Sequence, residues 1–125
     1  MRRVFKTRHF GRWARKVGLS DAGLCGAVRE MEQGLIDAEL GGYLFKKRVA
    51  IPGKGKRGGL RTIVATQRQQ GWFFIHGFEK SVQANLGSAE LEALKELAIS
   101  LLELPPPALT KMIESRALTE ICRDE

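Results

Sequence analysis

Three strand-like runs in the middle of the chain constrain its fold more than any other feature. The runs are "GGYLFKKRVAI", "GLRTIVATQ" and "GWFFIHGFEKS", and the turn signals "PGKGKRGG" and "RQQG" separate them. β-branched and aromatic residues are enriched in these runs, as is typical of strands. Because short turns join consecutive strands antiparallel, the pattern predicts an antiparallel meander.

Helical spacing precedes this meander. Apolar residues recur at i, i+3, i+4 and i+7 over residues 10–17 and again over residues 24–31. Gly18 signals the end of the first helix, and Ser20 is a good N-cap for the second. We predict that the two helices form an αα-hairpin, which follows a short strand candidate, "RRVFKT".

A longer helix is predicted after the meander, within "SAELEALKELAISLLEL". Ser88 is expected to cap it, Glu90 suits its positive end, and Pro105 stops it. Its apolar stripe consists of Leu91, Leu94, Ala98 and Leu101. Beyond it, "ALTKMIESRALTEI" could form one more short helix and a terminal strand, Leu118 to Ile121.

The predicted order is β-α-α-β-β-β-α with a C-terminal extension. Helices grouped apart from a meander indicate the α+β class, here with an antiparallel or mixed sheet of about four strands. A chain of 125 residues is long enough to bury a real core. We predict one domain over residues 1–125, with a core of residues 1–104 and a short extension over residues 105–125.

Positive charge is concentrated in the first two thirds of the chain. Residues 1–88 contain 17 Lys and Arg but 6 Asp and Glu, whereas residues 89–125 contain 4 and 8. Two stretches, residues 2–16 and 46–61, each carry seven cations and no acid. Clustered cations attract polyanions. A membrane partner is not expected, because no helix combines an apolar and a cationic face over several turns.

The second basic stretch contains a match to G-x-G-x-x-G that begins at Gly53. A dinucleotide-binding loop needs a helix after its glycines, and the β-branched residues of "GLRTIVATQ" favour a strand instead. We interpret the segment as a flexible turn between two strands that carries Lys54, Lys56 and Arg57 into solvent.

Cysteine and histidine are too sparse to suggest a metal centre. Cys25 and Cys122 lie far apart and form no C-x-x-C motif, so neither a disulfide scaffold nor a zinc site is predicted, and Cys25 is expected to be a small core residue. His9 and His76 come with no third ligand pattern, and no metal or cofactor is expected. The absence of a membrane span or an apolar signal core predicts a cytoplasmic protein.

The predicted meander gathers cations on one face of its sheet. Because side chains alternate along a strand, Lys46 and Arg48 share a face and Lys47 lies on the other. Arg61 begins the next strand, and Lys80 ends the third. One face could therefore hold Lys46, Arg48, Arg61 and Lys80 beside the cationic turn.

His76 lies in "FFIHGF", on a strand where Trp72, Phe74, His76 and Phe78 are predicted to share one face. Such an aromatic row is first of all expected to be core. His76 could be a core or edge histidine, a general acid–base group or a ring that stacks on a base, because its pKa lies near neutrality.

Two longer stretches, "LGGYLFKKRVAIPGKGKRGGLRTIVA" and "FFIHGFEKSVQANLGSAELEALKELA", resemble small RelE-superfamily toxins of bacterial toxin–antitoxin pairs, especially the HigB-type branch with its phage-derived members. The similarity covers roughly residues 1–104. It implies a microbial-RNase-like fold with a basic concave sheet, and a ribosome-dependent mRNA endonuclease (mRNA interferase). It also implies a cognate antitoxin, which we expect to be an acidic protein that could itself bind DNA.

The resemblance also implies roles for single residues. Arg61 matches the arginine that opens the third strand of such toxins, and Lys80 matches the cation that ends the fourth. Lys46 and Arg48 match second-strand cations, and His76 resembles the histidine of HigB-like segments. RelE itself carries a functional Tyr shortly after the last cation, whereas this chain reads "VQANL" there.

Cleavage by such a site would need no metal. The 2′-hydroxyl of one nucleotide attacks the adjacent phosphate and expels the 5′-oxygen, and Arg61 stabilises the growing charge on the phosphoryl oxygens. His76, or a Lys with a lowered pKa, would take the 2′ proton, and Lys80 would neutralise the leaving group. The cations expected to bind RNA or the ribosome are Lys47, Lys54, Lys56 and Arg57.

Two other functions are open at this point. One is a ParE-like toxin that inhibits gyrase with the same fold. The other is a non-catalytic RNA-binding protein or an inactive phage remnant. The combination of Arg61, Lys80 and the second-strand cations favours the nuclease.

Overall fold

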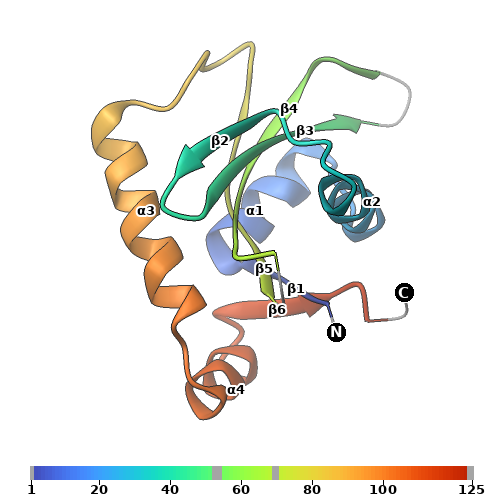
Figure 1. Ribbon diagram of the computed structural model, residues 1–125. Helices are drawn as coiled ribbons and strands as arrows, with labels where there is room; N and C mark the ends of the chain where they lie inside the picture. Colours follow the sequence, from blue (N-terminus) through green and yellow to red (C-terminus); the bar gives the residue numbers. More distant parts are fainter. Residues whose placement is uncertain (1, 52–54, 69–70, 124–125) are drawn as a thin grey trace.

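The computed structural model describes residues 2–51, 55–68 and 71–123 (Figure 1). Its elements are β1 (Arg3–Thr7), α1 (Arg8–Val17), α2 (Asp21–Glu32), β2 (Ala38–Gly41), β3 (Leu44–Ile51), β4 (Gly55–Thr66), β5 (Gly71–Glu79), α3 (Ser88–Leu102), α4 (Pro106–Glu114) and β6 (Leu118–Ile121). The α+β class, the αα-hairpin, the meander and the terminal strand are confirmed.

Six strands of the described chain form one mixed sheet in the order β2-β3-β4-β5-β1-β6. β1 runs parallel to β5, and the other neighbours are antiparallel. The predicted number of about four strands was too low. The four-residue edge strand β2 is too short to show a strand pattern, and β6 is the terminal strand expected at Leu118–Ile121, which adds to the sheet beside β1.

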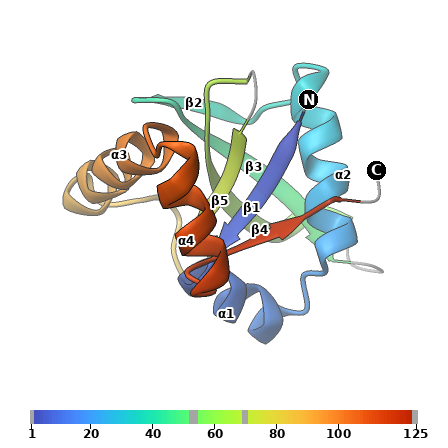
Figure 2. The same ribbon diagram turned by 90° about the horizontal axis from the view of Figure 1, so that it is seen from below.

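Helices cover both faces of this sheet, as the two views in Figures 1 and 2 show. α1 and α2 pack on one face, whose core includes Val64, Trp72 and Phe74. α3 and α4 pack on the other face, over Ile63 and Phe78. We call these the α2 face and the α3 face. Each helix of the described chain is too short or too polar to span a bilayer.

Helix ends follow local capping rules, with one exception to the predictions. The Ser20 hydroxyl accepts a hydrogen bond from the backbone N–H of Gly23 at 3.1 Å, and Gly18 adopts the left-handed conformation (φ 79°) that ends α1, both as predicted. The prediction that Ser88 caps α3 was wrong. Gly87 is the N-cap, and Ser88 is already the first helical residue.

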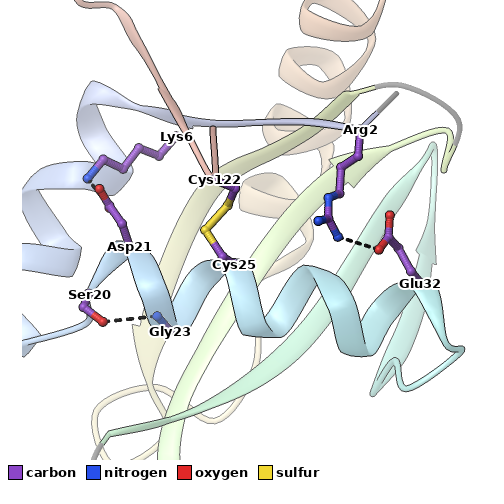
Figure 3. The surroundings of a disulfide bond; sticks show 8 residues. All are labelled: Arg2, Lys6, Ser20, Asp21, Gly23, Cys25, Glu32 and Cys122. Carbon is purple, nitrogen blue, oxygen red and sulfur yellow. Dashed lines mark hydrogen bonds and ion pairs between the residues drawn. A yellow bond between two sulfur atoms is a disulfide. The ribbon is translucent and has the colours of Figure 1, made fainter. Parts of the chain in front are cut away.

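Cys25 and Cys122 form a disulfide, with their Cα atoms 5.7 Å apart, which the expectation of no disulfide scaffold missed. Cys25 is buried on α2 as expected, but β6 places Cys122 beside it, and a separation of 97 residues gives no hint of this. Two ion pairs flank the bond, Lys6–Asp21 at 2.7 Å and Arg2–Glu32 at 2.6 Å (Figure 3). Together these links tie α2 to the β1–β6 edge.

The glycine-rich segment belongs largely to a strand. β4 begins at Gly55, which pairs with Ile51, so the turn is shorter than predicted. A strand and no phosphate-binding helix follows the glycines, as expected. Lys54 lies outside the described residues, and so do the side chains of Lys56 and Arg57.

A β-bulge divides the predicted aromatic row on β5. Ile63 pairs with His76 while the next residue, Val64, pairs with Phe74, so β5 carries one extra residue at this point. Trp72 and Phe74 therefore belong to the core of the α2 face, whereas Phe78 belongs to that of the α3 face. The prediction that these rings and His76 share one face was wrong.

Candidate functional site

Two rows of side chains cross β3, β4 and β5 on the α3 face. In the first row Lys46 lies opposite Ile63, and Ile63 lies opposite His76. The second row consists of Arg48, Arg61 and Phe78. Because the rows are two residues apart along β4, Arg61 is a diagonal neighbour of both Lys46 and His76. The backbones of such diagonal neighbours are typically about 7–8 Å apart. The structure thus brings Lys46, Arg48 and Arg61 onto one face, as predicted.

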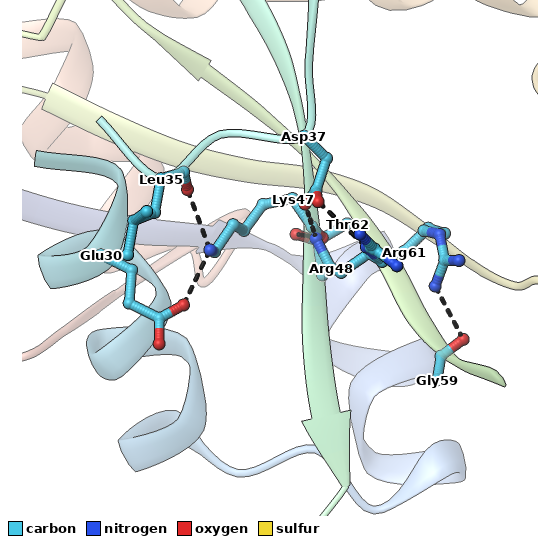
Figure 4. A network of polar contacts seen from close by, with 8 residues as sticks. All are labelled: Glu30, Leu35, Asp37, Lys47, Arg48, Gly59, Arg61 and Thr62. Atoms are coloured by element: carbon cyan, nitrogen blue, oxygen red, sulfur yellow. Dashed lines mark hydrogen bonds and ion pairs between the residues drawn. The ribbon is translucent and has the colours of Figure 1, made fainter. Parts of the chain in front are cut away.

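Arg61 is the most enclosed cation of this face, with 7% of its surface exposed. Its Nη1 donates to the carbonyl oxygen of Gly59 at 3.3 Å, which is its side chain's one hydrogen bond within the described residues (Figure 4). A guanidinium carries five N–H donors in a rigid fork. Arg61 is therefore held by its strand, and its other N–H donors make no hydrogen bond within the described residues.

Arg48, opposite Arg61, is partly neutralised. Its Nε lies 3.0 Å from Oδ1 of Asp37, and its backbone N–H donates to Oδ2 of the same carboxylate (Figure 4). Burial pushes the pKa of Asp37 upward, but the hydrogen bonds and charge of Arg48, with the charge of Lys47, outweigh it and hold that pKa below its ordinary value. Arg48 can thus bind an anion only in competition with a carboxylate.

Lys47 lies on the α2 face, as the alternation predicted, and it is 4% exposed. Its Nζ donates to the carbonyl oxygen of Leu35 at 2.9 Å and forms an ion pair with Glu30 at 2.7 Å (Figure 4). An ammonium enclosed in this way is not accessible to a polyanion. The structure therefore contradicts the expected role of Lys47 in RNA binding and indicates a structural role instead.

Lys46 and Lys80 lie at the margins of the two rows. Lys46 is half-buried on β3, and Lys80 is exposed in the turn that follows β5. Neither makes an ion pair within the described part of the chain. Because Lys80 lies beyond the end of its strand, the sheet does not hold it in position as it holds Arg61.

His76 is enclosed between the first turns of two helices. The ring of His9, from α1, stacks on the His76 ring: the two ring centroids are 5.6 Å apart, and the angle between the ring planes is 5°. From α3, Glu90 brings Oε2 to 3.3 Å from Nε2 of His76, and its Oε1 accepts a hydrogen bond from Gln83 at 2.9 Å. His9, His76 and Leu94 also line a largely apolar pocket of about 330 Å³.

The environment of His76 favours its neutral form. Burial lowers the pKa of its imidazole below the ordinary 6.5, Glu90 opposes this shift with its negative charge, and His9 adds to it. The Nε2 atom is buried and makes no hydrogen bond within the described residues. A neutral imidazole can accept a proton, and the nearby Glu90 carboxylate would stabilise the imidazolium that forms.

His9 and Glu90 are the neighbours of His76 that sequence reasoning missed. β1 pairs in parallel with β5, and α1 follows β1 directly, so His9 arrives beside His76. That pairing is long-range and has no local signal. Glu90 has a signal, an acid in the first turn of α3, but the helix dipole explains it without reference to a site.

Metal-ligating side chains do not cluster here: among the described residues no group of three or more His, Cys, Asp or Glu could hold a metal ion. The α3 face thus carries a nearly buried guanidinium, further cations and an imidazole whose pKa is lowered by burial, on a mixed sheet.

These features define a small α+β protein with a basic, histidine-containing sheet face. Residues 2–121 match the family described as the RelE toxin of the RelE/RelB toxin–antitoxin system, and the chain belongs to this family. The match extends through α4 and β6, beyond the residues 1–104 on which the resemblance was based. A comparison with curated proteins found no match.

Proposed function

We propose that this toxin cuts mRNA on the ribosome and that the α3 face is its active surface. The observation that carries the proposal is the position of Arg61, strand-held and nearly buried, diagonal to the neutral His76. Family membership supports a toxin with a cognate antitoxin. We further propose that the chain belongs to the HigB-like, phage-derived branch and acts in the cytoplasm.

Arg61 acts on the phosphate. The 2′-oxygen forms a bond to phosphorus while the bond from phosphorus to the 5′-oxygen breaks, which leaves a cyclic phosphate and a 5′-hydroxyl. Negative charge grows on the non-bridging oxygens, and a guanidinium fork already in place stabilises that charge more than it stabilises the ground state. Lys46 supports the same charge from the neighbouring row, and Arg48 does so once Asp37 releases it.

His76 acts on the proton. Its neutral imidazole accepts the proton of the 2′-hydroxyl, and the resulting imidazolium faces the Glu90 carboxylate at 3.3 Å. Glu90 is thus a positioning residue, and Gln83 holds it by a hydrogen bond. Lys80 neutralises the leaving 5′-oxygen, and the adjoining apolar pocket can take a flat base.

The remaining cations bind rather than react. Lys54, Lys56 and Arg57 are proposed to hold RNA or the ribosome. An acidic antitoxin, which could also bind DNA, is proposed to cover the α3 face with a helix across Lys46, Arg61 and Lys80. Because complementary charge speeds association, that complex should form more slowly as salt rises. An association rate insensitive to salt, with these three side chains no less accessible in the complex than in the free toxin, would contradict this arrangement.

The test is induced expression without the antitoxin, followed by primer extension on cellular mRNA. We expect growth arrest with new 5′ ends inside translated regions, and none of these with an equally expressed Arg61→Ala variant. Normal growth at confirmed expression would contradict a toxin. Arrest with intact mRNA and inhibited gyrase would favour the ParE-like alternative.

A further inference from the structure

Most cations of the first basic stretch, residues 2–16, lie away from the site on the α3 face, to which this stretch contributes His9. Four of its cations are exposed along α1, namely Arg8, Arg12, Arg15 and Lys16. α1 contains no acidic residue, and its buried side, with Phe10 and Ala14, packs on the α2 face. The outer side of α1 is therefore basic along its whole length.

A hollow of about 340 Å³ lies next to this side of α1. Its walls include Lys6, Thr7, Arg8, Arg15, Arg116 and Thr119. Gly11 forms part of its floor: a Cβ atom there would lie 3.8 Å from Nη1 of Arg15 and 3.9 Å from Cδ of Lys6. These two cations therefore converge over a position that has no side chain.

Arg8 connects two walls of the hollow by hydrogen bonds. Its guanidinium donates to the carbonyl oxygens of Ser115 at 2.9 Å and Arg116 at 3.3 Å, and its backbone N–H donates to the carbonyl oxygen of Ala117 at 3.1 Å. These three bonds hold the turn before β6 against α1. They place Arg116 beside the α1 cations although the two segments are about a hundred residues apart.

Little negative charge balances this surface. Lys6 forms an ion pair with Asp21 at 2.7 Å. Arg12, Arg15, Lys16 and Arg116 make no ion pair within the described residues. Arginine predominates, and its planar fork binds phosphate in a bidentate manner.

We propose that this α1 surface, formed by Arg8, Arg12, Arg15, Lys16 and Arg116, binds the phosphate backbone of structured RNA. Arg8 and Arg15 are about 10 Å apart along the helix axis, a length that spans about three phosphates of one strand of a duplex. The rings of α1 are engaged within the protein: Phe10 is buried, Trp13 packs over Gly77, and His9 stacks on His76. The contact is thus to backbone and independent of base sequence.

The surface has a different task from the site. α1 packs on the α2 face (Figure 2), whereas the Arg61 rows, which include Ile63 and Phe78, lie on the α3 face. One surface would hold folded RNA, such as that of the ribosome, while the other acts on the single strand. The inference rests on the proposed function for its choice of RNA as the partner.

The test measures binding of an RNA hairpin duplex as a function of salt, in an Arg61→Ala background so that cleavage plays no part. The variant is Arg12→Gln with Arg15→Gln. The control, Lys111→Gln with Arg123→Gln, removes the same charge from exposed positions elsewhere. We expect the variant to lower the slope of log K against log salt by about two, with at least about tenfold weaker binding near 0.1 M salt, and the control to match the parent.

Equal losses in the two double variants would overturn the proposal, because net charge alone would explain them. Unchanged hairpin binding in the α1 variant would also overturn it, and a loss confined to antitoxin binding would identify an acidic protein as the occupant. Because no step of the assay needs cleavage, it separates this proposal from the nuclease: the hairpin result stands even if the chain cuts no mRNA.

Discussion

Lys46 and Lys47 are neighbours in the chain, but their side chains lie on opposite faces of the sheet, and the two faces differ in their role. On the α2 face Lys47 is enclosed by α2 and paired with Glu30, and the Cys25–Cys122 bond lies in the same layer. On the α3 face Lys46 belongs to a row with His76, whose Nε2 has no hydrogen-bond partner in the described chain. On the α2 face the buried charge is paired with groups of the protein itself, whereas on the α3 face the buried imidazole nitrogen makes no hydrogen bond within the described residues.

The comparison separates charges that hold the fold from charges that await a ligand. A buried ammonium must be paired, because an unpaired charge away from water is costly. Incomplete pairing at a strand-held arginine and a buried imidazole is instead typical of a site that a substrate completes. Changes on the α2 face should therefore act on stability, and changes on the α3 face on activity.

The largest effect on stability is expected from the disulfide. The disulfide closes a loop with a sequence separation of 97 residues. Closing a loop of that length constrains the unfolded chain by roughly 5 kcal/mol, so the Cys25→Ala, Cys122→Ala variant should lose up to about that much unfolding free energy in urea. Its cleavage rate should be unchanged. Reductant should destabilise the parent and leave the double variant unaffected.

The disulfide also bears on where the toxin acts, because such bonds are rare in the cytosol. If the chain works in the cytoplasm, alkylation in cell extracts should find both thiols reduced and the fold correspondingly less stable. A fully oxidised bond in freshly lysed cells would contradict the cytoplasmic proposal.

The two neighbouring lysines offer a matched pair of variants. Lys47→Ala breaks an enclosed ion pair and a hydrogen bond and should cost roughly 2 kcal/mol of unfolding free energy. Lys46→Ala removes the same charge and should stay within about 0.5 kcal/mol of the parent, yet slow cleavage. Urea titrations and cleavage assays on both variants check this. The reverse assignment, with Lys46 stabilising and Lys47 catalytic, would refute the division of the two faces.

A smaller effect is expected on the titration of His76. Glu90→Gln removes the charge that raises the pKa of His76, so this pKa should fall further, whereas His9→Gln removes a charge that lowers it and should raise it. The amide that Glu90→Gln introduces keeps an oxygen to accept the hydrogen bond from Gln83. NMR titration of the His76 ring in both variants tests the contacts directly, and shifts of the same sign would exclude the described geometry.

The lowered pKa of His76 also fixes the sign of a pH dependence. Below about 6.5 the unfolded chain binds a proton that the folded chain still excludes, so stability falls as pH drops from 6.5 toward the folded pKa. Replacing His76 by Gln should flatten this slope in urea titrations. Cleavage should rise with pH through the same pKa and then level off, because the neutral ring is the base.

Local patterns were enough to predict much of the fold. Glycine and serine signals located α1 and α2, and strand alternation correctly separated Lys46 and Arg48 from Lys47. Prediction failed where the outcome depends on long-range pairing or on one inserted residue. The bulge at Ile75 sends Phe74 and His76 to opposite faces.

The same limit applies to the site. Arg61 and His76 could be selected from residue type and family resemblance, but their partners could not. The parallel β1–β5 pair brings His9 to His76, and the β1–β6 pair brings Cys122 to Cys25. Both contacts join residues more than sixty positions apart, for which spacing in the sequence carries no information.

The most direct test of the division between the faces is single-turnover cleavage on programmed ribosomes at saturating toxin, with Arg61→Ala and Arg61→Lys. If Arg61 stabilises the transition state, Arg61→Ala should lower the rate by roughly 10²-fold or more at unchanged stability. Arg61→Lys should restore little of it, because a point charge does not reproduce the fork. A full cleavage rate for Arg61→Ala, with only weaker binding, would contradict the account and leave Arg61 with a role in binding alone.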